Sequence, residues 1–161
     1  GFELVELPYL GDQLAMTLIV PAAGRFAEIE AGLDRPFFDA ALAEGRTYRV
    51  DLALPKFSFR AELDLVAPLR ELGMVDAFDP NRADFSGITD ASALFISGVI
   101  HQAFIDVNEQ GTEAAAATAV TFEDTSVPEE VSVDVNRPFM LVLRDRPTGA
   151  VLFVGRVVDP R

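Results

Sequence analysis

The run of small residues that begins near Glu109 constrains the fold more than any other part of this sequence. Its centre is four consecutive alanines, at 114–117, bordered by threonine and more alanine. As a helix, the run would extend from about residue 112 to 119 with Thr112 as its cap, because alanine is the best helix former. As a strand, the same run would direct alternate side chains to opposite faces. The pattern alone leaves both interpretations open.

The strand interpretation separates the charges of this run onto one face. The uncharged face consists of Thr112, Ala114, Ala116, Thr118, Val120 and Phe122. The other face consists of Glu113, Ala115, Ala117, Ala119, Thr121 and Glu123. Small uncharged side chains can enter a narrow gap in a sheet, whereas an inward charge opposes burial. The run is therefore suited to become a buried strand. The alternative is an exposed alanine-rich loop or helix with no switching role.

Composition limits the partners. The chain has 161 residues, 50% of them hydrophobic, which is about one domain and enough for a core. Its 26 acidic and 13 basic residues give a net charge of −13, which argues against nucleic acid or an anionic membrane as partner. No apolar run is long enough to span a bilayer. The chain has no cysteine, which excludes disulfides and thiolate metal sites and leaves the compartment open.

The sequence offers little that an enzyme needs. His101 is the only histidine, so the familiar nucleophile triads lack parts unless His101 serves, and its apolar, strand-like surroundings argue against that. Scattered carboxylates do not identify a glycosidase pair. Neither a glycine-rich phosphate loop nor a histidine-rich metal spacing is present. We therefore expect no enzyme, no metal site and no cofactor.

Hydrophobic periodicity predicts a β-rich α+β fold. Strands are expected at 2–7, 14–20, 47–54, 57–63, 93–106, 131–135, 138–144 and 151–158. Short helices are expected at 26–33, 36–43 and 66–72, with Pro36 at a first helical position and Gly45 and Gly73 at helix ends. The first two strands should form an antiparallel pair, and the last two a hairpin through residues 146–149. Apolar residues on both faces of 93–106 predict a central strand.

Several separate motifs, in the right order, resemble those of the serpin family, the suicide inhibitors of serine proteases. They are Leu-Pro-Lys-Phe at 54–57, Leu-Arg-Glu-Leu-Gly-Met at 69–74 with Phe78, Ala-Asp-Phe-Ser-Gly-Ile at 83–88, Ile-His-Gln-Ala at 100–103, Val-Asn-Glu-Gln-Gly-Thr-Glu-Ala-Ala at 107–115, Arg-Pro-Phe at 137–139 and the segment 153–160. Together they cover nearly the whole chain and are similar to a bacterial-type member. A complete serpin is more than twice as long, so the resemblance is to the C-terminal portion.

The resemblance implies a serpin fold and a spring-like mechanism. The chain would form the C-terminal portion of one serpin domain, with an N-terminal portion before Gly1 and a reactive-centre loop at about 109–130. A serine protease attacks this loop and forms an acyl-enzyme, and the freed loop then inserts as a new central strand and distorts the protease. The native state is metastable and supplies no catalytic residue. The resemblance also implies a monomer in the full-length form and favours an extracellular location.

The family's spacing from Glu109 implies a scissile bond between Thr125 and Ser126. The stretch from Ser126 to Pro138 is slightly longer than usual, so Asp124 is the second candidate for the residue before the bond. Thr125 would favour elastase-like or subtilisin-like proteases. A bond after Asp124 would imply a very different target.

The resemblance also assigns structural roles. The hinge would consist of Glu109, Gly111, Thr112, Ala114, Ala116 and Thr118, whose small inserting side chains fit an inhibitory member. Lys56 would pair with Glu109 at the top of the main sheet; otherwise these are two unrelated surface charges. His101 would be a structural gate that hydrogen-bonds to strands outside this chain. Without the resemblance, a single histidine in an apolar strand indicates a core histidine whose ring nitrogens are hydrogen-bonded.

Two other functions stay open. One is a non-inhibitory serpin that acts as a binding or chaperone-like protein. The other is a partial chain without activity. Cleavage of the loop should separate an inhibitor from a non-inhibitory member, because only a loop that inserts raises thermal stability.

Overall fold

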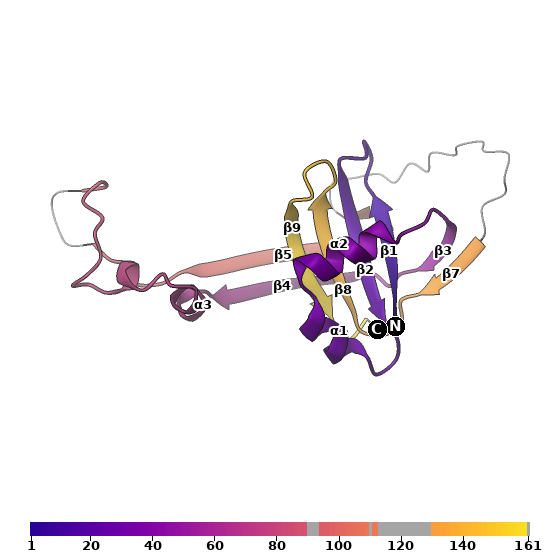
Figure 1. Cartoon of the computed structure of the whole chain (residues 1–161), viewed down its shortest axis with the longest axis horizontal. Coiled ribbons are helices and arrows are strands. Elements are labelled where there is room, and N and C mark those ends of the chain that lie inside the picture. Colours follow the sequence, from indigo (N-terminus) through magenta and orange to yellow (C-terminus); the bar gives the residue numbers. More distant parts are fainter. Residues whose placement is uncertain (90–93, 110, 113–129, 161) are drawn as a thin grey trace. The chain divides into compact units, whose positions relative to one another are not determined.

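The computed structural model of the chain describes residues 1–89, 94–109, 111–112 and 130–160. The chain divides into two compact units. One unit comprises Gly1–Phe57 with Asp106–Arg161, and the other comprises Ser58–Ile105. Strands outnumber helices in the described part, and the β-rich α+β class predicted from periodicity is confirmed (Figure 1).

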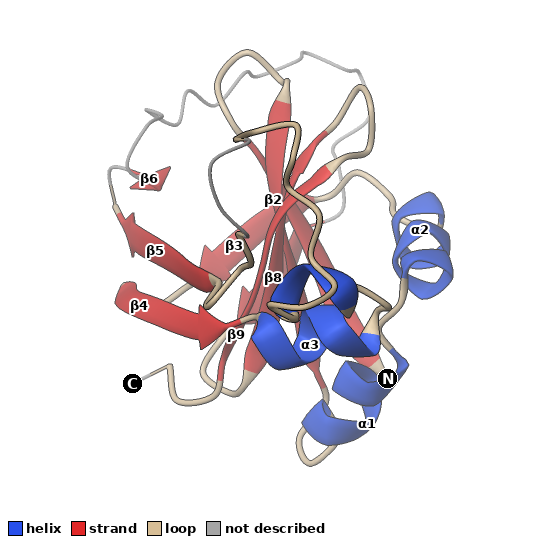
Figure 2. Cartoon of the chain, turned by 90° about the vertical axis from the view of Figure 1, so that its left-hand side faces the viewer, coloured by secondary structure: helices blue, strands red, loops and turns tan. Residues whose placement is uncertain are grey.

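A four-stranded antiparallel sheet forms the centre of the first unit (Figure 2). Its strands, in sheet order, are β1 (Phe2–Pro8), β2 (Leu14–Pro21), β8 (Phe139–Asp145) and β9 (Val151–Val157). The antiparallel pair predicted at the start of the chain is confirmed as β1 with β2, and the predicted hairpin at its end as β8 with β9. The register that joins the two pairs runs from Leu14 opposite Asp145 to Ile19 opposite Met140.

The central strands of this sheet are buried on both faces. One face carries Ile19, Met140 and Val142, which pack against helices α1 (Phe26–Gly32) and α2 (Arg35–Ala43). Leu18 and Leu141 lie on the opposite face and are at most 1% exposed. Burial on both faces explains why residues 14–20 are apolar at every position except Thr17, rather than alternating.

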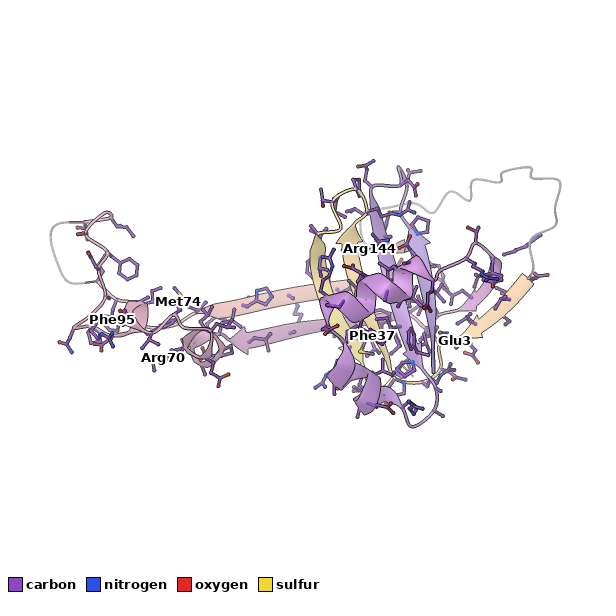
Figure 3. All side chains as sticks on the ribbon, in the orientation of Figure 1. Glu3, Phe37, Arg70, Met74, Phe95 and Arg144 are labelled. Atoms are coloured by element: carbon purple, nitrogen blue, oxygen red, sulfur yellow. The ribbon has the colours of Figure 1, made fainter. Side chains whose placement is uncertain are left out.

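Local chemistry sets the beginning of α2. The Asp34 carboxylate accepts a hydrogen bond of 2.8 Å from the Phe37 amide, which caps the helix. The helix begins at Arg35, so Pro36 occupies the second helical position. The prediction had placed it at the first. Both positions suit proline, because neither amide has a partner within the helix. The ring of Phe37, labelled in Figure 3, packs 5.2 Å from that of Phe2 on β1.

The β8–β9 hairpin is closed by side-chain bonds within its turn. The Asp145 carboxylate accepts hydrogen bonds from the Thr148 hydroxyl and, at 3.0 Å, from the Thr148 amide. These two bonds hold the pKa of Asp145 below its usual range, with the hydroxyl as the larger cause. Gly149 follows with φ of +69°, a conformation that glycine adopts without strain.

A parallel pair of strands completes the first unit. Strand β3 (Arg49–Ala53) pairs with β7 (Glu130–Asp134), from Arg49 opposite Glu130 to Ala53 opposite Asp134. Strand β3 lies within the predicted range 47–54, and β7 begins and ends one residue before the predicted range 131–135. Alternation within a strand does not specify its partner, so this pairing was not predicted.

The second unit is a strand pair with a helical segment between its strands. Strand β4 (Phe57–Asp64) is followed by α3 (Val66–Glu71) and the short 3-10 turn η1 (Asp76–Phe78). Strand β5 (Ile100–Asn108) then lies beside β4 (Figure 1). The order β4-β5-β6 makes β5 central among the described strands, as its two apolar faces predict.

The prediction that the strand before residue 106 begins at 93 was wrong. Residues 94–99 form no regular structure, and β5 begins at Ile100. Their backbone groups bond elsewhere: the Ile96 amide donates to the Ala77 carbonyl at 2.9 Å, and the Val99 carbonyl accepts from the Leu65 amide at 2.9 Å. These contacts to the helical segment replace a strand ladder. The apolar pattern alone could not distinguish the two.

Replacing Phe139 tests the core. Phe139 is fully buried and its ring lies 5.6 Å from that of Phe57, so Phe139→Ala should lower the free energy of unfolding by about 3–5 kcal/mol. Urea denaturation measures this loss. Leu72→Ala is the matched control, because Leu72 is 84% exposed and its replacement should change stability by less than about 0.5 kcal/mol. Equal effects of the two substitutions would contradict the assignment of the core.

Candidate functional site

Two strand ends flank the alanine-rich run. On its N-terminal side, the short strand β6 (Gly111–Thr112) turns back on β5 and pairs antiparallel with it, Thr112 opposite Val107 and Gly111 opposite Asn108. On its C-terminal side, β7 begins at Glu130. Residues 113–129 lie outside the described residues. Thr112 is therefore part of a strand, and the helical alternative for this position is excluded.

The N-terminal flank carries an exposed ion pair. Lys56 is in the connection between β3 and β4, and Glu109 directly follows β5. The Lys56 ammonium is 2.7 Å from the Glu109 carboxylate. The two side chains are 62% and 70% exposed, so solvent screens their attraction and the pair contributes less than about 1 kcal/mol to stability. The structure thus brings these two predicted partners together. Glu109 is two residues before Gly111, where β6 begins, so the ion pair is next to the predicted hinge.

The C-terminal flank is held by buried residues. Val133 on β7 is 4% exposed, and Val135, just after this strand, is fully buried. The Val135 amide donates to the Ala53 carbonyl at 2.9 Å, which extends the contact with β3 beyond the last pair of the ladder. Phe139, also fully buried, then begins β8. From β7 onward, the chain therefore runs directly into the core.

Arg137 connects this flank to the four-stranded sheet. Its guanidinium donates to the Pro21 carbonyl at 2.9 Å and to the Asp134 carbonyl at 3.1 Å, and it pairs with the Glu3 carboxylate at 2.5 Å. The sequence interpretation used Arg137 only as part of a family motif and assigned it no role. In the sequence, only its position directly before Pro138 sets Arg137 apart. That position indicates a change between two strands but does not identify the groups that Arg137 binds.

His101 lies on β5 and is exposed in the described part of the chain. It is therefore not buried among the described residues, as a core histidine would be. Its neighbour Gln102 donates to Glu62 on β4 at 2.8 Å. The role of His101 as a structural gate stays a prediction.

The remaining predicted positions lie outside the described residues. They are the hinge positions Ala114, Ala116 and Thr118, and the cleavage candidates Asp124, Thr125 and Ser126. Their assignments stay predictions. Of the hinge, the structure describes Glu109 and the backbone of Gly111 and Thr112.

Metal and membrane sites were sought in the described ranges. Within these ranges, no group of three or more histidine, aspartate or glutamate side chains is arranged to hold a metal ion. No helix among the described residues is long and apolar enough to cross a membrane.

Comparison with known proteins gives one consistent family. The family model described as serpin (serine protease inhibitor) matches residues 1–160. The chain is 40% identical over 159 residues to a protein named as an uncharacterized serpin-like protein of Methanosarcina acetivorans. The match covers 98% of this chain and 37% of that protein. The chain is also 40% identical over 164 residues to plasminogen activator inhibitor 1 of Neovison vison, with 99% and 40% covered.

A solved structure agrees with these matches. Thyroxine-binding globulin in complex with thyroxine superposes with a TM-score of 0.81 at 33% identity, over 99% of this chain and 41% of that chain. The chain thus spans about two fifths of the length of the relatives it matches.

The contribution of the Lys56–Glu109 pair can be measured with a double-mutant cycle of Lys56→Ala and Glu109→Ala. We expect a coupling free energy below about 1 kcal/mol that falls as salt is added, because both side chains are exposed. Arg35 and Asp39, 57% and 51% exposed, form a comparable control pair on α2. A coupling above about 2 kcal/mol would mean that the pair is shielded from solvent.

Proposed function

Since the chain belongs to the serpin family, we propose that the protein inhibits a serine protease by acting as its suicide substrate. The observation that carries this proposal is strand β6, which already pairs with β5 where the alanine-rich run begins. The alanine-rich run therefore continues from a strand, β6, that is already paired antiparallel with β5. Beyond Val107, the β6 side of β5 has no partner strand among the described residues.

The register favours insertion of the uncharged face. Thr112 opposite Val107 extends by two-residue steps to Ala114 opposite Ile105, Ala116 opposite Ala103 and Thr118 opposite His101. Of the two faces of β5, this is the one that contains its buried residue, Val107. Opposed residues lie on the same side of a sheet, so the uncharged side chains of the run would share the more buried face, and Glu113 would lie on the other.

The proposed reaction uses the protease's own chemistry. The protease's serine oxygen bonds to the carbonyl carbon of Thr125, the bond to the Ser126 nitrogen breaks, and the new amine leaves with a proton from the protease's general acid. The freed run then adds to β5 and carries the acylated protease with it. This chain supplies the bond that is cleaved and the strand that inserts, while the protease supplies the catalytic groups. The small Thr125 side chain favours an elastase-like or subtilisin-like protease.

The first test is a covalent complex. The full-length protein is incubated with elastase-like, subtilisin-like and chymotrypsin-like proteases and analysed on a denaturing gel. We expect a band that contains both proteins, because the acyl bond survives denaturation. Mass analysis of the released C-terminal peptide then distinguishes cleavage after Thr125 from cleavage after Asp124. Clean cleavage by every protease, without such a band, would contradict the suicide mechanism for these targets.

The second test alters the inserting face. Ala116→Glu would add a charge to the face that is buried on insertion, so the loop should still be cleaved but the yield of covalent complex should fall at least about tenfold. Ala115→Glu is the matched control, since it adds the same charge one residue away on the outward face and should leave most of the yield intact. Equal losses in the two variants would contradict the proposed register.

The likeness to thyroxine-binding globulin supports a second candidate, a non-inhibitory binding protein. The described part of the first unit also has an open, mainly apolar hollow of about 210 Å³ between α2 and the β8–β9 pair. Thermal melting before and after loop cleavage separates the two candidates. An inserting loop raises the melting temperature, whereas a purely binding protein needs no such gain.

A further inference from the structure

The junction between β7 and β8 lacks a backbone donor where the sheet needs one. Continuing the β2–β8 register by two residues beyond Ile19 and Met140 sets Pro21 opposite Pro138. Proline has no N–H, so neither residue can donate to the other. The Nε of Arg137 donates to the Pro21 carbonyl instead, at 2.9 Å. The side chain of Arg137 thus supplies the donor that Pro138 cannot.

The same guanidinium reaches two more elements. Its Nη1 donates to the carbonyl of Asp134, the last residue of β7, at 3.1 Å. Its Nη2 pairs with Glu3 on β1, labelled in Figure 3, at 2.5 Å. The Arg137 side chain is 30% exposed, so this ion pair is better shielded than that of Lys56 with Glu109. One planar side chain therefore joins the ends of β2 and β7 to β1, a geometry that suits arginine and not lysine.

Strand β7 has few other attachments. Among the described strands it pairs only with β3, over five residues, and of these five only Val133 is buried. Val135 and Arg137 then hold its C-terminal end. If this end were released, residues 130–134 would be added to the segment that precedes β8, and the loop would be tethered less tightly.

We propose that Arg137 is a positioning residue that holds the C-terminal flank of the reactive loop in place while the protease attacks. The inference rests on the proposed inhibitory function. A loop fixed at both ends presents its scissile bond in a limited set of orientations, which raises the rate of acylation. In this proposal Arg137 acts through β7, which it contacts at the Asp134 carbonyl, and takes no part in the chemistry of the bond.

Arg146 provides a matched control in the same sheet. It forms ion pairs with Glu6, at 3.2 Å, and with Asp12, at the opposite end of the β1–β2–β8 contacts. Like Arg137, it is about one third exposed and joins β8 to the β1–β2 pair. It makes no contact with β7 that the structure describes. Arg146→Ala therefore removes comparable charge interactions without touching the loop's flank.

The test compares Arg137→Ala, Arg137→Lys and Arg146→Ala in the full-length protein. Hydrogen exchange followed by mass spectrometry reports on the peptide that contains residues 130–135, and the rate constant of covalent complex formation reports on the loop. For Arg137→Ala we expect roughly tenfold faster exchange in β7 and a rate constant lowered by a similar factor. Arg137→Lys should recover little of either, because the three N–H donors of an ammonium share one nitrogen, whereas Arg137 reaches its three acceptors with three different nitrogens of a rigid plane. Arg146→Ala should change neither.

The outcomes distinguish this inference from the proposed function. If the unaltered protein forms no covalent complex with any protease, the inhibitory function fails, and the positioning role fails with it. If the unaltered protein forms the complex but Arg137→Ala forms it equally fast, only the positioning role is overturned. Unchanged exchange in β7, or equal effects of Arg137→Ala and Arg146→Ala, would also overturn it.

Discussion

The antiparallel pairing of β2 with β8 is the contact on which the rest of the first unit depends. It joins residues 14–19 to residues 140–145, so everything between them, including the whole second unit and the alanine-rich run, is a chain segment closed by this pair. Closing so long a segment costs conformational entropy. Burial of both strands on both faces offsets that cost, because apolar area removed from water stabilises by about 25 cal/mol per Å². The C-terminal flank of the alanine-rich run is thereby attached to the most buried part of the described chain.

The two flanks of the alanine-rich run are held very differently. The N-terminal flank has a ladder of two residue pairs and an ion pair in water, Lys56 with Glu109. The C-terminal flank has a five-residue ladder, two buried valines and the three bonds of Arg137. In the proposed mechanism, the residues before the cleaved bond must move and those after it must stay. The asymmetry of the flanks agrees with that requirement.

The sequence predicted the local features of this fold better than the distant ones. Alternation predicted β1, an apolar run predicted β2, and turn residues predicted the β8–β9 hairpin, because the partners within each pair are adjacent in sequence. The beginning of β5 was predicted wrongly, since residues 94–99 bond to Ala77 and Leu65 through contacts that no periodicity records. The Lys56–Glu109 contact was inferred from family resemblance and not from spacing. The bonds of Arg137 could not be predicted, because two of its acceptors are backbone carbonyls that meet only in the folded chain.

The proposed mechanism is limited by rate as well as by energy. Extending β6 along β5 from Asp106 to Ile100 would add up to seven opposed pairs to the ladder, and each net hydrogen bond contributes about 0.5–1.5 kcal/mol. The sum is comparable to the 5–15 kcal/mol that separates a typical native domain from its unfolded state. That much free energy can distort a bound protease, but only if insertion precedes hydrolysis of the acyl bond. Small, uncharged inward side chains shorten the insertion step, since none has to shed a charged hydration shell. In the proposed mechanism, the inward alanines Ala114 and Ala116 would therefore serve the speed of insertion more than the stability of its product.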